Sequence, residues 1–457
     1  MYRNHRLWML AALVAAVVLV VGGSRVPAAN AESTQLYIYR VAAPSESAAQ
    51  RLIDAGFDVL EDRTGADLLV LGDAATAGQL RTAGFRTTGV ERLKPTYWTP
   101  PSTRLVPNAA APAVAPVDET YFGGYHTVVA QFAHLDQVAA ARPNLATVVD
   151  YGDSYRKTRN PATGYDLKAI CITRKQAGDC ALTPSAPKPR FLLMTQIHAR
   201  EIVTSDVAWR FIDHLVNNYG SNSAVTTLLN GTEVWVVPVV NPDGVDVVQQ
   251  GGNRPLLQRK NQNTSAGNCA NPPTSSNQAG VDLNRNTANH WGTVGSSTSP
   301  CSQTYRGSGA DSEPETKAIN RLFRQLFADQ RGPGDNDAAP ATTRGAMISI
   351  HSFAGMNLFP WGWTNRDSGN HAALRSIASR MSQLNGYRFG QPGEILYNAS
   401  GTSDDWSYGE LGIASFTIEL ASCGSFTPAH SCTTTDFNRN LPVLMLVAGL
   451  AKAPYRP

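Results

Sequence analysis

Hydrophobic residues in the C-terminal three quarters of the chain form short continuous runs, separated by longer stretches of mixed polarity. The apolar, β-branched runs predict strands at 147–151, 167–173, 191–195, 234–240, 347–350 and 415–420. The mixed stretches predict helices at 201–219, 313–329, 372–384 and 438–450. This alternation is typical of an α/β domain whose mixed, mostly parallel twisted sheet is covered by helices on both faces. In such folds the ligand site lies beyond the carboxyl ends of the strands.

The N-terminal part shows a different pattern, with a faint duplication. Residues 51–57 (RLIDAGF) resemble residues 79–85 (QLRTAGF), and each reads as a helix end with a glycine at its stop. Strand-like runs at 36–41 and 68–71 precede the two helices. We therefore expect a small α+β unit at 32–93 with a two-fold βαβ arrangement of the ferredoxin type. This unit holds no histidine and no cysteine, so a catalytic role is not expected.

Two further segments flank this unit. Arg3 and Arg6 precede an apolar run at 7–21, and Ala29-Asn30-Ala31 forms a small-x-small cleavage site. This layout predicts a secretory signal peptide at 1–31 and an exported protein. The alternative is an uncleaved membrane anchor, but the 15-residue run is shorter than the ~20 residues that span a bilayer. Residues 94–117, rich in Pro and Ala, predict an extended linker to the α/β domain at 118–457.

Composition and charge narrow the range of partners. The chain has 457 residues, and its 42% of hydrophobic residues can bury a large core. It carries 39 basic and 36 acidic residues, and the predicted signal peptide contains three of the arginines and no acidic residue. The exported chain is therefore neutral, which disfavours nucleic acid or an anionic membrane as a partner. We expect a monomer with no stable membrane association after the signal is removed.

The six cysteines fit an exported protein, in which an even number predicts disulfides. Six cysteines allow fifteen connectivities, of which pairing between sequence neighbours is favoured because each pair closes a stretch containing Gly, Pro or Ser. Zinc bound by cysteine is the alternative, but no Cys-x-x-Cys motif occurs. The expected pairs are Cys171–Cys180, Cys269–Cys301 and Cys423–Cys432.

Candidate metal ligands follow two of the predicted strands. The strand at 191–195 runs into a turn with His198 and Glu201, which can point a ring nitrogen and a carboxylate at one ion. The strand at 347–350 delivers His351 to the same edge of the sheet. Zinc accepts such ligands, and a catalytic site leaves one position open for water. Alternatively, Glu201 complements a helix dipole and His351 makes an ordinary hydrogen bond.

A candidate base lies in a third strand. Glu419 is the single carboxylate in the apolar run at 415–420. A charge buried there costs several kcal/mol unless it is paired or coordinated, and a position beside a metal site would satisfy that requirement. The alternative is an edge strand that leaves Glu419 in solvent.

Other polar residues suit recognition of a carboxylate or an oxyanion. We expect the segment at 280–286 to run from strand to turn. It contains the Asn284-Arg285 pair, whose guanidinium can form a bidentate pair of hydrogen bonds with a carboxylate. Arg259 could supply a cation to a developing oxyanion, and Tyr397 lies in a glycine-containing loop that could close over a ligand. Taken singly, each is more often structural, and Arg259 in particular reads as a surface residue.

Taken together, these segments resemble the zinc metallocarboxypeptidases of the carboxypeptidase A, B and T type. The resemblance covers the chain from about residue 118 almost to its end, in the family's order. It implies the zinc carboxypeptidase fold, a pro-domain at 32–93 and an export signal, as in a secreted zymogen. The matching segments are His198-Ala199-Arg200-Glu201, Asn284-Arg285, His351-Ser352, Tyr397 with Asp405-Trp406-Ser407-Tyr408, and Phe416-Thr417-Ile418-Glu419-Leu420.

The resemblance also implies a role for each residue. One zinc ion per chain would be held by His198, Glu201 and His351. Glu419 would take a proton from the attacking water and deliver it to the leaving amine, and Arg259 would stabilise the oxyanion. The substrate, the C-terminus of a peptide or protein, would be bound by Arg200, Asn284, Arg285 and Tyr397.

The resemblance places the side-chain selectivity at Asp404, seven residues after Tyr397. An acid at the base of the pocket favours a C-terminal Lys or Arg. Alternatively, Asp404 is a loop residue beside Asp405. Ala399 and Gly362, which match pocket positions of the family, leave room for a large side chain and for mixed selectivity.

Three other functions are alternatives to this one. Gly152-Asp153-Ser154 is the nearest sequence to a serine-hydrolase nucleophile, but no Gly-x-Ser-x-Gly motif is present. A zinc-bearing binding module would have no need of Glu419. A peptidase of the same fold that cleaves cell-wall peptides or small amides is disfavoured by Arg285 and Tyr397, although these residues do not exclude it.

Overall fold

The apolar runs become the strands of one eight-stranded mixed sheet. The structure is a computed structural model that describes residues 35–93 and 119–456. The predicted signal peptide and linker lie outside the described residues. The sheet order is β13-β12-β14-β11-β9-β10-β8-β7. Its strands are β7 (Ala146–Asp153), β8 (Asp166–Ile172), β9 (Arg190–Thr195), β10 (Glu233–Val237), β11 (Ala346–Ser352), β12 (Met356–Leu358), β13 (Arg388–Gly390) and β14 (Ala414–Leu420).

The central strands are parallel and buried. The pairs β14–β11, β11–β9 and β9–β10 are parallel, whereas β7, β8 and the β12–β14 pair are antiparallel. Every residue of β9, β11 and β14 is buried. Strands covered on both faces need apolar residues at successive positions, which explains why these three appear in the sequence as continuous runs.

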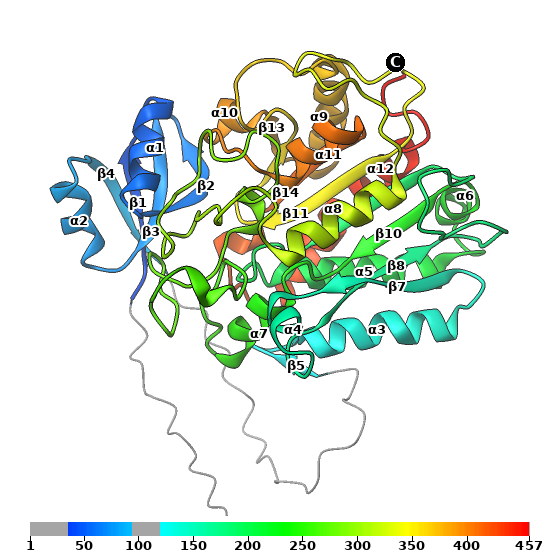
Figure 1. The fold of residues 1–457 in the computed structure, drawn as a ribbon, viewed down its shortest axis with the longest axis horizontal. Helices are drawn as coiled ribbons and strands as arrows, with labels where there is room; N and C mark the ends of the chain where they lie inside the picture. Colours follow the sequence, from blue (N-terminus) through cyan, green and yellow to red (C-terminus); the bar gives the residue numbers. More distant parts are fainter. Residues whose placement is uncertain (1–34, 94–118, 457) are drawn as a thin grey trace, which may run out of the picture. The chain divides into compact units, whose positions relative to one another are not determined.

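Helices cover both faces of this sheet (Figure 1). Phe191 and Leu193 of β9 point into a core shared with one set of helices, and Leu192 and Met194 point into the opposite core. The first set contains α3 (Val128–Ala141), α5 (Val203–Asn218), α6 (Ser223–Gly231), α7 (Pro242–Gln250), α9 (His371–Asn385) and α12 (Ser431–Leu450). The second contains α8 (Pro314–Leu326) and α11 (Ser403–Leu411). Short elements complete the domain, namely β5 (Thr120–Tyr121), β6 (Tyr125–His126), α4 (Tyr155–Arg159) and α10 (Pro392–Ile395).

The N-terminal unit has the expected two-fold arrangement. Its antiparallel sheet has the order β2-β3-β1-β4, with one helix after β1 and one after β3. The duplicated glycines Gly56 and Gly84 both adopt positive φ, which ends each helix in a left-handed residue. The phenylalanines that follow them, Phe57 and Phe85, pack edge to face at 6.0 Å. The elements are β1 (Tyr37–Ala42), α1 (Glu46–Asp54), β2 (Asp58–Thr64), β3 (Asp67–Gly72), α2 (Thr76–Thr82) and β4 (Thr87–Arg92).

Two predicted boundaries and one predicted strand are wrong for local reasons. Strand β10 stops at Val237 because Pro238 cannot donate to the ladder. Helix α12 begins at Ser431 rather than 438, because the Cys423–Cys432 disulfide anchors a first turn rich in threonine, a poor helix former. The segment at 280–286 contains no strand, since the Asp282 carboxylate accepts from the Asn284 N–H at 2.9 Å and caps a 3₁₀ turn at Leu283–Arg285.

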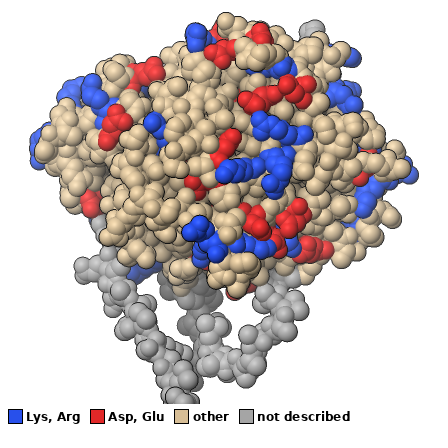
Figure 2. All heavy atoms as spheres, viewed as in Figure 1, with Lys and Arg blue, Asp and Glu red and all other residues tan. Residues whose placement is uncertain are grey.

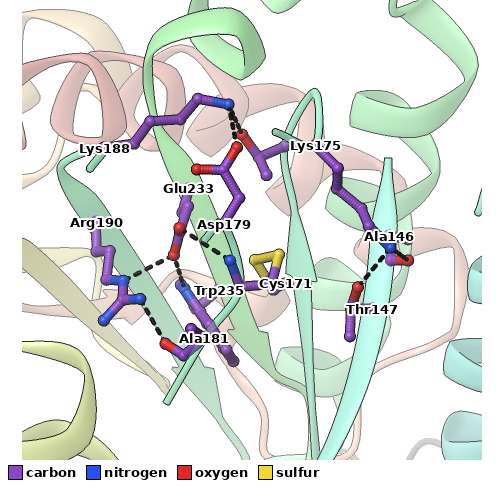
Figure 3. The surroundings of a disulfide bond; sticks show 12 residues. Ala146, Thr147, Cys171, Lys175, Asp179, Ala181, Lys188, Arg190, Glu233 and Trp235 are labelled. Atoms are coloured by element: carbon purple, nitrogen blue, oxygen red, sulfur yellow. Dashed lines mark hydrogen bonds and ion pairs between the residues drawn. A yellow bond between two sulfur atoms is a disulfide. The ribbon is translucent and has the colours of Figure 1, made fainter. Parts of the chain in front are cut away.

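All six cysteines pair as expected, so cysteine is excluded as a zinc ligand. Figure 3 shows the surroundings of the disulfide between Cys171 of β8 and Cys180. Buried Glu233 accepts from the Cys180 N–H at 3.0 Å, from Arg190 at 2.7 Å and from the Trp235 indole at 2.9 Å. The disulfide and this carboxylate together tie the loop after β8 to the starts of β9 and β10.

The surface carries both signs of charge. Figure 2 shows one face, on which Lys and Arg side chains are interspersed with Asp and Glu. Among the residues that the structure describes, no helix combines the length and the apolar character needed to cross a bilayer.

Candidate metal centre

The centre of the site lies where the chain leaves β9. His198 and Glu201 occupy the turn between β9 and α5, which starts with Gln196 at a φ of +52°. This unusual conformation is fixed by hydrogen bonds, because the Gln196 N–H donates to the Thr204 hydroxyl at 3.1 Å. His351 lies in the neighbouring strand β11, next to β9 and directly opposite Glu419 of β14.

His198, Glu201 and His351 converge closely enough to share one ion. His198 Nδ1 lies 2.7 Å from Glu201 Oε1 and 3.1 Å from His351 Nδ1, and His351 Nδ1 lies 3.2 Å from Glu201 Oε2. Bonds of ~2.1 Å to a tetrahedral zinc ion put the ligand atoms about 3.4 Å apart, close to these distances. All three side chains are buried. The donor set of two imidazoles and one carboxylate therefore fits zinc.

The electrostatics of Glu201 agree with a ligand role. Burial alone would raise the pKa of its carboxyl, but the neighbouring His198 and His351 rings outweigh burial and hold that pKa below its usual range. The group is therefore a carboxylate, the form that binds a metal.

The outward-facing ring nitrogens have partners of their own. His198 Nε2 lies 3.2 Å from Asp282 Oδ1, and His351 Nε2 lies 3.0 Å from the Ser349 hydroxyl. Such contacts orient an imidazole and leave its Nδ1 free for a metal. Neither partner was predicted from the sequence, although Asp282 stands two residues before the Asn284-Arg285 pair and could have been suspected from that position.

Glu419 is buried beside these ligands, not exposed on an edge. Strand β14 lies between β12 and β11, and Glu419 is 2% exposed. Burial, followed by the negative charges of Glu201 and Glu61, raises the pKa of the Glu419 carboxyl well above its usual range. Its Oε2 has no hydrogen-bond partner among the residues described. A buried, unpartnered carboxylate oxygen beside three metal-ligating groups is explained by a site built for a cation and for a water that exchanges a proton.

Arg259 is part of the same cluster, and the interpretation as a surface residue is wrong. It is 1% exposed, and its Nε donates to Asp282 Oδ2 at 3.2 Å. Its Nη1 lies 3.9 Å from Glu201 Oε1 and 2.8 Å from Glu61 Oε1. Burial lowers the pKa of the guanidinium, but Asp282, Glu61 and Glu201 more than compensate and raise it. The structure thus places a permanent cation at the edge of the candidate metal site.

Two of the predicted carboxylate-binding residues contact each other. Arg285 Nη2 donates to the Tyr397 hydroxyl at 3.1 Å, and Arg285 Nε donates to the Gly295 carbonyl at 2.8 Å. Asn284 Oδ1 accepts from the Ser403 N–H at 2.9 Å. Burial raises the pKa of Tyr397 to about 12, so its hydroxyl stays protonated at neutral pH.

Asp404 lies in the first turn of helix α11, close to these residues. It is buried, and its Oδ2 accepts from the Thr417 hydroxyl of β14 at 3.1 Å. The adjacent Asp405 accepts from the Gly362 N–H at 2.8 Å, while the Ala399 N–H donates to the Gly362 carbonyl. The small residues and the two acids named from the sequence therefore lie in one neighbourhood.

Arg200 faces the N-terminal unit. Its guanidinium forms a two-pronged ion pair with Asp58 of β2, at 2.7 and 2.9 Å, and its plane lies over the Phe426 ring. Phe426 in turn belongs to a buried cluster with Ile38 and Leu60 of the N-terminal unit. Neither Asp58 nor Glu61 was predicted from the sequence, because local patterns around an acid on a strand do not reveal a partner 140 to 200 residues away.

The chain is similar in sequence to known proteins. The family model described as zinc carboxypeptidase matches residues 132–439. Carboxypeptidase B2 of Homo sapiens is 32% identical over 67% of this chain and 65% of its own length. Carboxypeptidase A2 of Mus musculus is 31% identical over 67% of this chain and 64% of its own length. The chain thus matches just under two thirds of the length of these relatives.

Solved structures share the fold. The carboxypeptidase A from Helicoverpa armigera aligns with a TM-score of 0.66 and 24% identity, covering 92% of this chain and 98% of that one. Thrombin activatable fibrinolysis inhibitor aligns with a TM-score of 0.65 and 22% identity, covering 91% and 99%. At these identities the likeness establishes the fold, including the N-terminal unit, and nothing finer.

Proposed function

Because this chain belongs to the zinc carboxypeptidase family, we propose that it is a secreted metallopeptidase that removes the C-terminal residue of peptides. One observation carries the proposal: the ligating atoms of His198, Glu201 and His351 lie within 4.8 Å of one another, beside the Glu419 carboxylate, whose Oε2 has no hydrogen-bond partner among the residues described. The disulfides and the signal-like N-terminal sequence support export.

The chemistry divides between the ion and the chain. When bound, zinc polarises the scissile carbonyl and lowers the pKa of water to near 7. Glu419 accepts a proton from the attacking water on its free oxygen and later delivers it to the nitrogen of the leaving amino acid, so that one water is consumed for each bond broken. Arg259 stabilises the negative charge that develops on the carbonyl oxygen.

The remaining polar residues determine which bond is cut. Arg285 and Tyr397, with Asn284, bind the terminal carboxylate, and this anchor limits cleavage to the last peptide bond. Arg200 contacts the peptide on the other side of the scissile bond. Because these residues bind the negatively charged terminal carboxylate, converting that carboxylate to an amide should prevent hydrolysis.

A panel of peptides that differ only in their last residue tests the function and its selectivity. We expect peptides ending in Lys or Arg to be cut fastest, because Asp404 offers a negative charge at the base of the pocket, and a chelator should abolish all cleavage. Asp404→Asn should lower kcat/KM for these peptides by about tenfold or more relative to a peptide ending in Leu, since one partner of a buried charge pair is lost.

The matched control is Asp335→Asn, which alters an acid that is partly exposed and outside the site. If peptides ending in Lys and in Leu are cut with equal kcat/KM by both variants and by the unmodified protein, Asp404 does not determine the selectivity. A peptidase specific for cell-wall peptides, or an amidase of small acyl groups, would leave the whole panel uncut.

We further propose that the protein is made as a zymogen, with the pro-domain at 32–93 covering the site. The Asp58–Arg200 pair supports this, as does the packing of N-terminal residues in one cluster with Tyr397 and Ala399. We expect the intact chain to be nearly inert and to gain about 100-fold in activity after a cut in the linker, as for a cover closed in ~99% of molecules. Peptide hydrolysis before and after limited proteolysis measures this, and equal rates would reject the proposal.

A further inference from the structure

The chain around Arg259 forms neither a helix nor a strand, yet it is buried. Residues 257–261 lie between α7 and a short 3₁₀ turn at Thr264–Ala266, and residues 258–261 are each at most 2% exposed. Backbone N–H and C=O groups that are buried outside a helix or a sheet need hydrogen-bond partners from elsewhere. The backbone that carries Arg259 is therefore held by groups outside its own segment.

The side-chain amide of Gln278 makes four hydrogen bonds, three of them to this segment. Its Oε1 accepts from the Arg259 N–H at 2.7 Å and from the Lys260 N–H at 3.1 Å. Its Nε2 donates to the Leu257 carbonyl at 2.9 Å and to the Thr274 carbonyl at 3.3 Å. Gln278 is fully buried, and both ends of its amide are used, so its partners fix the orientation of the side chain.

Gln278 is itself anchored in a cross-linked loop. Its N–H donates to the carbonyl of Cys301 at 3.1 Å, and Cys301 forms the disulfide with Cys269. The carbonyls on either side, at positions 300 and 302, both accept from the Lys260 ammonium at 2.7 Å. Three successive carbonyls of this loop thus support the segment that carries Arg259.

On its other side, the Arg259 backbone contacts the turn of the metal ligands. Its carbonyl accepts from the Ala199 N–H at 3.0 Å, and Ala199 directly follows His198. Its guanidinium lies beside Glu201 and Asp282. A shift of the Arg259 backbone would therefore move the cation relative to the metal centre, and a misplacement of about 1 Å can cost ~10²-fold in rate.

We propose that Gln278 is a positioning residue for Arg259, because its amide fixes the backbone from which the guanidinium reaches the oxyanion. The inference rests on the proposed function, in which Arg259 stabilises the charge on the substrate's carbonyl oxygen. None of the described hydrogen bonds of Gln278 reaches a metal ligand, so its effect on the reaction passes through Arg259. Loss of Gln278 should lower kcat and leave KM nearly unchanged, since the charge develops only in the transition state.

The experiment uses the full chain, cut in the linker, and compares Gln278→Met with Gln303→Met. Gln303 is a second buried glutamine, whose amide donates to the carbonyls at 274 and 275 instead of the segment of Arg259. We expect Gln278→Met to lower kcat by about 30-fold or more, with KM changed by less than about threefold. Gln303→Met should change both constants by less than about threefold.

A double substitution tests whether Gln278 acts through Arg259. Arg259→Ala removes the cation and should lower kcat by ~10²–10³-fold, as loss of one oxyanion-stabilising group does. Adding Gln278→Met to Arg259→Ala should lower kcat by less than about threefold more, because both changes remove the same interaction. Losses that add in full would mean that Gln278 acts by another route, and they would overturn the inference.

Hydrogen exchange gives a readout that does not depend on catalysis. The amides of Arg259 and Lys260 both donate to Gln278, so the peptide covering residues 257–261 should exchange about tenfold or more faster in Gln278→Met than in Gln303→Met. Gln278→Glu keeps the accepting oxygen and loses a donor, so its exchange and its kcat should lie between those of Gln278→Met and the unmodified protein. Zinc content should be the same in all of these variants.

Thermal unfolding shows whether each variant is folded. If Gln278→Met does not fold, Gln278→Glu decides the question by the same double substitution. A loss of kcat that disappears when Arg259→Ala is already present supports the inference, and no loss, or a loss that persists there, overturns it.

The outcomes keep the two proposals apart. If the unmodified protein cuts peptides and a folded Gln278→Met has unchanged kcat, the inference about Gln278 is overturned and the proposed function stands. If no form cuts any peptide, the proposed function fails, and the exchange rates still decide whether Gln278 fixes the Arg259 backbone.

Discussion

Glu419→Gln is expected to reduce peptide hydrolysis by about 10³-fold or more and to leave bound zinc unchanged. Glutamine has nearly the same shape but cannot accept a proton from water and pass it on, and general acid–base catalysis contributes ~10²–10⁴-fold. Here one carboxylate performs both transfers, so the loss should lie in the upper part of that range. The measurement is kcat/KM of the activated enzyme, together with the zinc content of the same sample.

The environment of Glu419 makes this substitution informative. The side chain is buried in the central sheet and its Oε2 has no partner in the described structure, so an amide removes no ion pair. Glu410→Gln, which alters an exposed side chain on α11, is the matched control and should retain full activity. A zinc-bearing binding module would lose nothing measurable in either variant, and activity of Glu419→Gln above a tenth of the unmodified rate would contradict the assignment.

His351→Ala is expected to abolish both zinc binding and hydrolysis. His351 supplies one of three ligating groups, and its removal leaves one imidazole and Glu201. Substituting an outer partner of a metal ligand costs ~10–100-fold in affinity, so loss of a ligand itself should cost more. Zinc per chain after dialysis, measured by mass spectrometry, should fall from one to near zero.

His371→Ala is a suitable control for this variant. His371 lies at the start of α9 and contacts the exposed Asp367, outside the metal centre. Its substitution should leave zinc content and activity unchanged. One zinc per chain in His351→Ala would mean that the ion is held elsewhere.

Much of the fold could be predicted because its signals are local. Strands β9, β11 and β14 are buried on both faces, so each is marked by an unbroken apolar run that needs no knowledge of its neighbours. The repeat of the N-terminal unit was visible because both helices stop at a glycine that must adopt positive φ. The cysteine pairs of the sequence could be guessed because each loop is short or rich in turn residues.

The candidate ligands were predictable for a related reason. His198 and Glu201 follow a buried strand at a spacing of three, and parallel neighbouring strands bring their carboxyl ends to the same edge of the sheet. The position of Glu419 was informative because a lone charge within an apolar strand requires an explanation. In each case the polar residue stands out from the apolar strand next to it or around it, so it could be noticed from the sequence alone.

Contacts between distant segments could not be read in this way. Asp282 orients both His198 and Arg259, yet its position two residues before the Asn284-Arg285 pair is the one hint of this in the nearby sequence. The pairing of Glu61 with Arg259 joins positions almost 200 residues apart, and neither residue stands in a distinctive pattern. Burial of Arg259, which the sequence suggested to be exposed, follows from these two long-range ion pairs.

The position of the zinc ion provides the most direct test of the proposed metal centre. An anomalous difference map from crystals of the full chain, recorded on both sides of the zinc absorption edge, should contain one strong peak. This peak should lie within bonding distance of Nδ1 of His198, Nδ1 of His351 and the carboxylate of Glu201. A strong zinc peak bounded by any other set of side chains, with none at this site, would contradict it.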